Sequence, residues 1–349
     1  MRQAYITETA QDAEQGGRSG SRVRAALGRW RRDPGIWRRG IVIAAFALLT
    51  GLLMIFHAQI PNRLGNLGSL TETFLPWLGL LVPLLLVLAL IRRSATALIA
   101  LLVPAVVWLN VFGGLLSSKS ENSEQRLRYA DKAALTVATH NVNADNPDPE
   151  GTARRVAESG AEIIALEELK AEAVPAYEKA LKSAYPHHSV VGTVGLWSKY
   201  PMRATGAVDI RLGWERAMRS TVATPAGDVA VYVAHLPSVR VKMKAGFTAN
   251  QRDESADALG HAISRDEVPR VVLLGDLNGT MNDRSLNAVT AQMRSTQGAA
   301  GDGFGFSWPA SFPMARIDQI MVKGVEPVSS WTLPRTASDH LPVAARVTF

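Results

Sequence analysis

Residues 271–280 read VVLLGDLNGT, and this stretch decides much of the fold. Four apolar residues run directly into Asp276 and Asn278, with a glycine on either side of this polar group. A short continuous apolar run bounded by glycines is typical of a strand that is buried on both faces. The stretch therefore predicts a buried strand that ends by presenting a carboxylate and an amide at the edge of a sheet.

Polar side chains stand beside other apolar runs in the same way, where a predicted strand begins or ends. Each has an ordinary explanation when taken singly, because Asx side chains in turns commonly bond their own backbone. Together they supply carboxylate and amide oxygens and imidazoles without any thiol, a set that suits Mg²⁺ or Mn²⁺ better than a structural zinc. The residues are His140, Asn141, Glu167, Glu168, His235, Asp276, Asn278, Asp318, Asp339 and His340.

Short β-rich runs alternate with helical ones throughout residues 135–349. Strands are predicted at 135–139, 162–166, 188–197, 206–210, 218–224, 229–234, 271–275, 317–322, 327–332 and 342–348. Helices are predicted at 149–159, with Asp148 as N-cap and Gly160 just past the end, and at 172–184, 248–264 and 283–292. Several adjacent strands with a few spaced helices indicate two packed sheets flanked by helices, rather than one doubly wound sheet.

The first third of the chain has a different composition. Residues 1–119 hold 13 Lys/Arg and 5 Asp/Glu, whereas residues 120–349 hold 25 and 26. The high isoelectric point is thus a property of the first third, and it gives no reason to expect a nucleic-acid-binding surface on the remainder. The chain has no cysteine, which excludes disulfides, thiolate nucleophiles and cysteine metal sites.

Three long apolar runs follow the basic start of the chain. A membrane span needs about 20 apolar residues, with about 17 as a lower limit. No run shows a polar face, which disfavours buried core helices as the alternative. A signal peptide is the alternative for the first run, but its arginine-rich lead is long and no A-x-A-like site follows. The three runs are IVIAAFALLTGLLMIF (41–56), FLPWLGLLVPLLLVLALI (74–91) and ATALIALLVPAVVWLNVFGGLL (95–116). The second and third are long enough for a transmembrane helix, and the first is long enough if it continues through His57–Ile60.

The arginines predict the orientation of these spans. Residues 21–40 carry seven Arg and one Asp, and Arg92 and Arg93 stand between the second and third runs. Short basic flanks stay in the cytoplasm, so the N-terminus is predicted inside and the rest of the chain outside. The predicted organisation is a basic cytoplasmic segment, three membrane helices, a polar linker and an extracytoplasmic domain, over residues 1–40, 41–116, 117–134 and 135–349.

Seven sequence blocks resemble the endonuclease/exonuclease/phosphatase superfamily in order and spacing. They are ATHNVN, IIALEEL, GLWSKYP, VAHLP, LLGDLNG, RIDQI and SDHLPV. With the preceding spans and the GFSWPASFPMARIDQI segment, the chain is similar to the membrane-bound (VanJ-like) branch associated with teicoplanin and vancomycin resistance in actinomycetes. One departure is Glu167, where the superfamily more often has Gln, and this residue is expected to add a negative charge beside the metal.

The resemblance implies a four-layer α/β/β/α sandwich of the pancreatic deoxyribonuclease type and a role for each site residue. Glu168, with Asn141 and Asp339, would hold Mg²⁺ or Mn²⁺ against a phosphate oxygen. His340 would be paired with Asp318, which fixes the tautomer of the imidazole and raises its basicity. The remaining residues would orient the attacking water and the phosphate or donate a proton to the phosphoryl group: Asp276, Asn278 and His235.

The fold is shared by nucleases and phosphatases, so it leaves the substrate open. The leading hypothesis is a multi-pass membrane enzyme that hydrolyses a lipid-linked phosphate or pyrophosphate of cell-wall metabolism outside the cell. One alternative is a surface nuclease, and nucleic acid is disfavoured because residues 120–349 carry a net charge of −1. Residues 239–247, VRVKMKAGF, would serve a bilayer or a nucleic acid, or form a solvated loop. The other alternative is a membrane protein that binds lipid or glycopeptide without catalysis.

Overall fold

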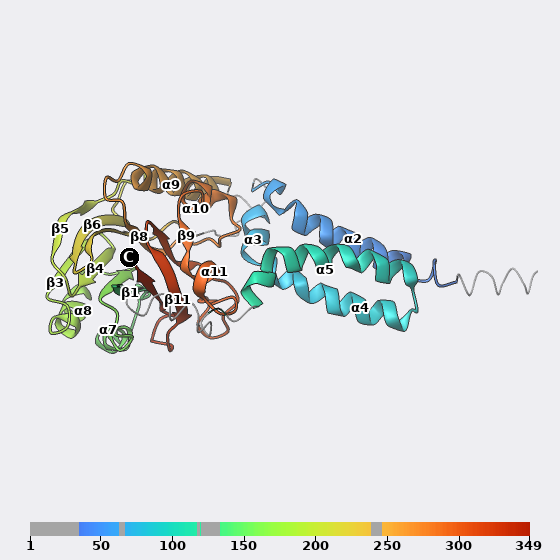
Figure 1. Ribbon diagram of the computed structural model, residues 1–349, viewed down its shortest axis with the longest axis horizontal. Coiled ribbons are helices and arrows are strands. Elements are labelled where there is room, and N and C mark those ends of the chain that lie inside the picture. The colour runs from blue at the N-terminus through green and yellow to red at the C-terminus, as the bar shows by residue number, and fades with distance from the viewer. Residues whose placement is uncertain (1–34, 63–66, 117–118, 120–132, 239–245) are drawn as a thin grey trace, which may run out of the picture. The chain divides into compact units, whose positions relative to one another are not determined.

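The computed structural model describes residues 35–62, 67–116, 119, 133–238 and 246–349 (Figure 1). The chain forms two compact units. The helical unit comprises Met1–Ile55 and Trp77–Trp108, and the second unit comprises Phe56–Pro76 and Leu109–Phe349. The basic N-terminal flank, most of the predicted linker and most of the cationic stretch at 239–247 lie outside the described residues.

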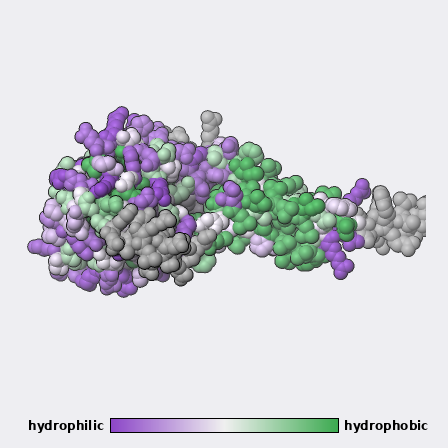
Figure 2. Space-filling view, in the orientation of Figure 1, coloured by the Kyte–Doolittle hydropathy of each residue, from purple (hydrophilic) through white to green (hydrophobic). Residues whose placement is uncertain are grey.

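The helical unit contains α2 (Ile41–Ile55), most of η2 (Leu75–Leu80), α4 (Leu81–Ile91) and the first part of α5 (Ala95–Leu116). Its core is built largely from alanines, and small side chains let helix backbones approach closely. Leucines, valines and isoleucines cover the outside of the helices and give the green surface of Figure 2. The buried residues of this core are Ala44, Ala47, Leu85, Ala89, Ala97, Ala100 and Leu101.

One helix of the described chain is long and apolar enough to cross a membrane, and this is α5 with 22 residues. The stretch containing α3 (Leu67–Thr73) and Leu75–Ile91 passes the same test only as a pair of helices bent by 68°. Helix α2 has 15 residues, below the usual lower limit of about 17 for a span. The prediction of three spanning helices stays a prediction.

The second unit is built on two mixed six-stranded sheets. The first has the strand order β11-β12-β1-β2-β4-β3 and the second β5-β6-β7-β8-β10-β9. Within them β1 pairs parallel with β2 and β7 with β8, and the other pairs are antiparallel. The strands are β1 (Ala134–Asn141), β2 (Ile163–Glu167), β3 (His187–Val191), β4 (Val194–Ser198), β5 (Met202–Ala207), β6 (Ala217–Thr224), β7 (Gly227–Ala234), β8 (Val271–Asp276), β9 (Arg294–Ser295), β10 (Asp318–Lys323), β11 (Glu326–Thr332) and β12 (Val343–Thr348).

The two sheets pack face to face, and helices cover their outer faces (Figure 1). The inner core holds β-branched and leucine side chains of both sheets, such as Val137, Val231 and Ile320. Helices α7 (Pro149–Ala157) and α8 (Val174–Leu181) pack on the first sheet, and α9 (Gly246–Ser264) and α10 (Asn287–Thr290) pack on the second. The predicted α/β/β/α sandwich is confirmed.

Several local predictions are confirmed and others need correction. Asp148 caps α7 by accepting from the Gly151 backbone N at 2.9 Å, as predicted. The predicted single strand at 188–197 is wrong, because Gly192, with φ of 57°, turns the chain between β3 and β4. The predicted helix at 283–292 is shorter and consists of η3 (Arg284–Leu286) and α10.

The segment Phe56–Pro76 belongs to the second unit, and buried charged side chains hold it there. Arg252 is fully buried, bonds Asp283 at 2.8 Å, and donates to Ser69 Oγ of α3 at 2.8 Å. Arg284 donates to the backbone oxygens of Ala58 and Ile60. The segment between the first two predicted spans therefore packs directly on the sandwich.

Candidate active site

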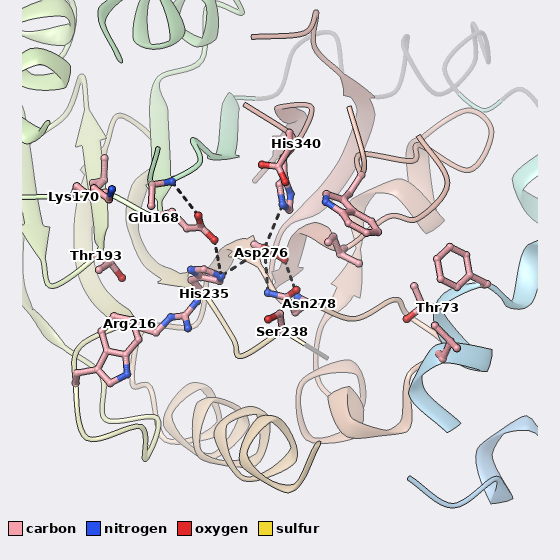
Figure 3. A pocket seen from close by; sticks show the side chains of 18 residues that line it. Thr73, Glu168, Lys170, Thr193, Arg216, His235, Ser238, Asp276, Asn278 and His340 are labelled. Carbon is pink, nitrogen blue, oxygen red and sulfur yellow. Dashed lines mark hydrogen bonds and ion pairs between the residues drawn. The ribbon is translucent and has the colours of Figure 1, made fainter. Parts of the chain in front are cut away.

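The predicted site residues meet where strands of the two sheets end. Strand β8 ends at Asp276, and its antiparallel partner β10 begins at Asp318, directly opposite in register. On the other sheet, Asn141 at the end of β1 stands in register with Glu167 at the end of β2. The adjacent ends of both sheets thus supply one cluster of side chains (Figure 3).

Asp276 is the centre of this cluster. Its Oδ2 accepts from the Asn141 amide at 3.0 Å and from the Asn278 amide at 3.2 Å, and its Oδ1 accepts from the Asn278 backbone N at 2.8 Å. The Nε2 atoms of His235 and His340 lie 3.7 and 3.9 Å from Oδ2. Two imidazoles therefore flank one buried carboxylate, which is the chemistry expected where a proton must be moved.

A glycine allows β8 to end in this position. Gly275 has φ of 144°, a conformation that L side chains rarely adopt, and a Cβ there would stand 2.0 Å from the Ala234 backbone oxygen of β7. Asn278, with φ of 47°, completes the turn, and its amide donates to the Leu236 backbone oxygen at 2.9 Å. The GDLN sequence is thus required both for the side chains that it carries and for the close approach of two strands.

His340 and Asp318 form the predicted pair. The imidazole Nδ1 lies 2.9 Å from Asp318 Oδ2, which also accepts from the Ser307 hydroxyl at 2.6 Å. Burial alone would lower the pKa of His340, but the charges of Asp318 and Asp276 raise it to about 10. For Asp318, burial alone would raise the pKa. The charge of His340 has the larger combined effect with its hydrogen bond, so the pKa of Asp318 is lowered. At neutral pH His340 is therefore an imidazolium.

His235 is held in the opposite state. Burial, then the positive charges of Arg216 and His340, lower its pKa well below the usual 6.5. Asp276 is buried beside the same two histidines, and burial together with the charge of Asp318 raises its pKa to about 7. A carboxylate that titrates near neutral pH between a charged and a neutral imidazole is suited to accept a proton from water.

The surroundings of Glu167 disfavour its negative charge. Its side chain is fully buried, and one carboxyl oxygen accepts from the Thr139 hydroxyl at 2.6 Å. Burial raises its pKa well above the usual value, and the charges of Asp318 and Asp276 raise it further. Burial thus works against the negative charge that was expected of Glu167, and the charge at this position stays a prediction.

The predicted metal ligands are only partly brought together. Glu168, with φ of 61°, turns its carboxylate into the pocket, where Oε1 accepts from the Asn141 amide at 3.1 Å and Oε2 from the Ala144 backbone N at 3.1 Å. Asp339 lines the same pocket, but its carboxylate accepts from the Asn143 amide at 3.0 Å. Carboxylate and amide oxygens without sulfur are the donors that Mg²⁺ takes, so these residues fit such an ion.

A second set of side chains could hold a metal ion, judged by their distances alone. Among the described residues, Asp276, Asp318 and His340 place one potential ligand atom each within 4.8 Å of one another. Asp318 already accepts from His340 and Ser307, so its oxygens are occupied. Glu168, Asp276 and Asp339 are the carboxylates that line the pocket, and the assignment of individual ligands stays a prediction.

The pocket over this cluster has a volume of about 650 Å³. Part of its lining could not have been found from the sequence, because Leu70 and Thr73 come from the segment between the first two predicted spans and Phe74 is the first residue of the second predicted span. In Figure 3, Thr73 lies across the pocket from Glu168. The pocket residues absent from the predicted set also include Lys170, Thr193, Trp214, Arg216, Ser238, Trp308 and Ile317.

The fold and this cluster of side chains are in keeping with a family of phosphoesterases. The chain belongs to the endonuclease/exonuclease/phosphatase family, whose model matches residues 138–340, more than half of the chain. Members of this family are phosphoester hydrolases that typically depend on a divalent metal. A search of curated proteins found no match to the chain.

Solved structures share the fold of the second unit. An endonuclease/exonuclease/phosphatase from Bacteroides vulgatus superposes with a TM-score of 0.54 at 16% identity, over 62% of this chain and 100% of that one. A mannosyl-6-phosphatase from Bacteroides thetaiotaomicron gives 0.50 at 17% identity, over 62% and 100%. Truncated TDP2 from Caenorhabditis elegans gives 0.51 at 17%, over 62% and 98%. At such identities the similarity shows a common fold only.

Proposed function

We propose that the chain is a membrane-anchored, Mg²⁺- or Mn²⁺-dependent hydrolase of a lipid-linked pyrophosphate, with an isoprenoid pyrophosphate as the first candidate. The observation that carries this proposal is the mixed lining of the 650 Å³ pocket. One part of the wall is the charged cluster around Asp276, and another part is apolar. The apolar side chains are Leu70, Phe74, Leu169, Trp214, Trp308 and Ile317.

In the proposed reaction, water attacks the terminal phosphorus, the bond from that phosphorus to the bridging oxygen breaks, and the products are inorganic phosphate and the lipid monophosphate. Asp276, oriented by Asn278 and Asn141, would accept the proton of the water. His340, held charged by Asp318, would stabilise the phosphoryl oxygens or give a proton to the leaving group. This assignment makes His340 the proton-holding group, in place of the water-activating role that its pairing first suggested.

A divalent ion held by Glu168 and Asn141 would polarise a phosphate oxygen and neutralise charge when bound. The protein would supply positioning, since phosphoryl transfer needs little covalent chemistry from side chains. His235, kept neutral by burial and by Arg216, could donate a hydrogen bond to the phosphate without adding a charge. Arg216, which stacks 4.9 Å from the Trp214 ring, lines the same wall and carries a positive charge suited to a second phosphate.

The proposed topology retains three spans, an inner N-terminus and an outer catalytic unit. It rests on the arginine-rich flank at 21–40 and on Arg92 and Arg93. Tags at residue 5 and at the C-terminus should report opposite sides of the membrane in intact cells. Loss of the C-terminal tag to added protease supports this orientation, and protection until lysis would contradict it.

The test of function is phosphate release by the purified full chain, with Mg²⁺ or with EDTA. We expect release from undecaprenyl pyrophosphate that EDTA abolishes, and little action on sphingomyelin, plasmid DNA or inositol phosphates. Nicking of the plasmid would favour the surface nuclease. Tight binding of the lipid by wild-type protein with no release under any metal would favour the non-catalytic membrane protein.

The apolar wall has its own test. Phe74→Ser should raise KM for a long-chain pyrophosphate by about tenfold, since a lost apolar contact of this size corresponds to about 1.5 kcal/mol. KM for a short, water-soluble pyrophosphate should stay unchanged. Phe312→Ser is the matched control, because Phe312 is 64% exposed and does not line the pocket. An equal change in KM for both substrates would remove the argument for a lipid.

A further inference from the structure

A second cavity of about 270 Å³ lies in the second unit, beside the C-terminal end of α5. Three aromatic rings line it: the centroids of Phe112 and Phe304 lie 5.9 Å apart, and those of Phe304 and Phe306 lie 5.1 Å apart. Leu115 of the same helix adds a further apolar side chain. This part of the cavity suits a hydrocarbon chain.

The cavity also contains a positive charge, because Arg316 lines it and is only 6% exposed. Its guanidinium donates to the Gly305 backbone oxygen at 2.9 Å and to Ser330 Oγ at 3.5 Å. Within the described part of the chain it forms no salt bridge, and its Nε has no hydrogen-bond partner. The charge of Asp318 acts on Arg316 without forming a direct ion pair, and burial lowers the pKa of Arg316 despite it. A buried cation without an anion in direct contact is unfavourable, so the site favours a negative ligand.

Two buried amides indicate what else the ligand must offer. The side-chain nitrogen of Gln297 donates to the backbone oxygens of Asp302 and Gly303, and that of Gln319 donates to Gly279 and Arg316. These contacts fix both amide orientations. The Oε1 atoms of both glutamines are buried and lack a hydrogen-bond donor among the described residues. A ligand with hydroxyl groups would satisfy both acceptors.

We infer that this cavity binds an anionic phospholipid with a hydroxyl-bearing headgroup, such as phosphatidylglycerol. The phosphate would pair with Arg316, the headgroup hydroxyls would donate to Gln297 and Gln319, and an acyl chain would pack on Phe112 and Leu115. The site lies at the end of α5, the helix that is long and apolar enough to cross a membrane, which is where such lipids are available. It is a different cavity from the one over the cluster around Asp276, although Thr73 lines both, and the inference does not depend on the substrate proposed above.

Native mass spectrometry of the detergent-solubilised full chain tests this inference. The protein is mixed with equal amounts of phosphatidylglycerol and phosphatidylcholine, and the retained lipid is identified. Wild-type protein should retain phosphatidylglycerol selectively, and Arg316→Gln should retain it at least tenfold less. Arg346→Gln, at an exposed position on β12, is the charge-matched control and should behave as wild type. Equal retention of the two lipids by wild type, or undiminished retention by Arg316→Gln, would overturn the inference.

A second pair of variants guards against misfolding of Arg316→Gln. A Cβ at Gly113 or at Gly114 would meet no atom within 4 Å, yet only Gly114 lines the cavity. Gly114→Trp should fill the cavity and abolish lipid retention, whereas Gly113→Trp should leave it unchanged. Identical retention by both tryptophan variants would refute the site.

Two further experiments distinguish a bound phospholipid from free phosphate and from the substrate. Excess inorganic phosphate should not displace the retained phosphatidylglycerol, because it offers neither the acyl chain nor the headgroup hydroxyls. Displacement at millimolar phosphate would mean that the cavity is an anion site and not a lipid site. A higher KM for the long-chain pyrophosphate in Gly114→Trp, with phosphatidylglycerol retention intact, would assign the cavity to the substrate chain instead.

Discussion

Two clusters of buried charge in the second unit invite comparison. The catalytic cluster joins Asp276, Asp318 and His340 at the sheet ends, and the anchoring cluster joins Arg252 and Asp283 beneath α3. All five side chains are almost completely buried. The difference is access: Asp276 and His340 line a cavity, whereas neither Arg252 nor Asp283 lines either of the two cavities described above.

The contrast teaches that buried charge does not by itself mark a functional site. Arg252 forms a direct ion pair with Asp283 and donates to the α3 hydroxyl of Ser69, so the pair holds one segment against the sandwich. His340 and Asp276 line the pocket over the cluster. The pKa of His340 is raised to about 10 and that of Asp276 to about 7, and such perturbed pKa values are common at functional sites. The anchoring cluster serves the site indirectly, because α3 carries Leu70 and Thr73 into the pocket wall.

The largest expected effect is on turnover in the catalytic cluster. Asp276→Asn removes the group proposed to accept the proton of the water, and His340→Ala removes the charge proposed to face the phosphoryl oxygens. Each should reduce kcat by about 10²–10⁴, the range of general acid–base catalysis. Phosphate release per folded molecule is the measurement, with folding checked by circular dichroism.

The same variants test whether the cluster acts as one unit. The double variant should be little worse than the worse single one, because groups that act in one step are not additive. Any resistance to a glycopeptide in cells should disappear together with turnover. Drug tolerance that persists in a catalytically dead variant would favour the binding hypothesis, and full turnover in both single variants would remove the site assignment.

The next effect concerns stability in the anchoring cluster. Arg252→Met leaves the Asp283 carboxylate buried without its cation, which should lower the free energy of unfolding by about 3–5 kcal/mol. Urea unfolding of the solubilised protein measures this loss. Asp276→Asn, in the catalytic cluster, keeps the shape of its side chain and should lose much less stability. A loss of the same size in both variants would erase the distinction between the two clusters.

The sequence predicts the catalytic cluster well and the anchoring cluster not at all. Asp276, Asn278 and Asp318 stand next to continuous apolar runs, and strands that end together at a sheet edge bring such residues together. Arg252 lies within a helix of mixed polarity, and its partner Ser69 is 183 positions away, in a short helix without a strong pattern. A pairing between residues so far apart depends on how the segment packs on the sandwich, and no pattern in the neighbouring sequence indicates it. The same holds for the apolar pocket residues that α3 contributes.

The pKa values show the same limit. The Asp318 charge that raises the pKa of His340 and the burial that lowers the pKa of His235 are both tertiary properties. Identical residue types at similar strand ends therefore acquire opposite charge states. The sequence supplied the chemical groups, but the raised pKa of Glu167 and the opposite pKa shifts of the two histidines arise from the packing.

A third buried cluster extends the comparison to pH. The Asp266 side chain is 3% exposed and accepts from Arg219 at 3.0 Å and from the Tyr232 hydroxyl at 2.7 Å. Burial raises its pKa, but these hydrogen bonds outweigh burial and hold the pKa below its ordinary value of 3.8. The stabilisation is therefore complete above pH 3.8 and is lost as the pH falls through the lower folded-state value.

Asp266→Asn should lower the free energy of unfolding at pH 7 by about 1.5–3 kcal/mol, the usual range for hydrogen bonds to a charged group. The difference from wild type should shrink below pH 3.8. Urea midpoints measured from pH 7 down to pH 3 give both values. A difference that grows in acid would show that Asp266 is not held ionised by its partners.

The smallest effect belongs to an exposed ion pair with the same chemistry as the anchoring cluster. Arg294 lies 2.8 Å from Glu326, the same separation as between Arg252 and Asp283, but the two side chains are 59% and 52% exposed. Water and salt screen such a pair, so a double-mutant cycle with Arg294→Ala and Glu326→Ala should give a coupling of about 0.2–1 kcal/mol that fades in high salt. The shortest contact is equally long in the two pairs, whereas their burial differs strongly. A coupling at Arg294 and Glu326 as large as the loss in Arg252→Met would therefore show that contact distance, and not exclusion of water, sets the strength of the anchoring cluster.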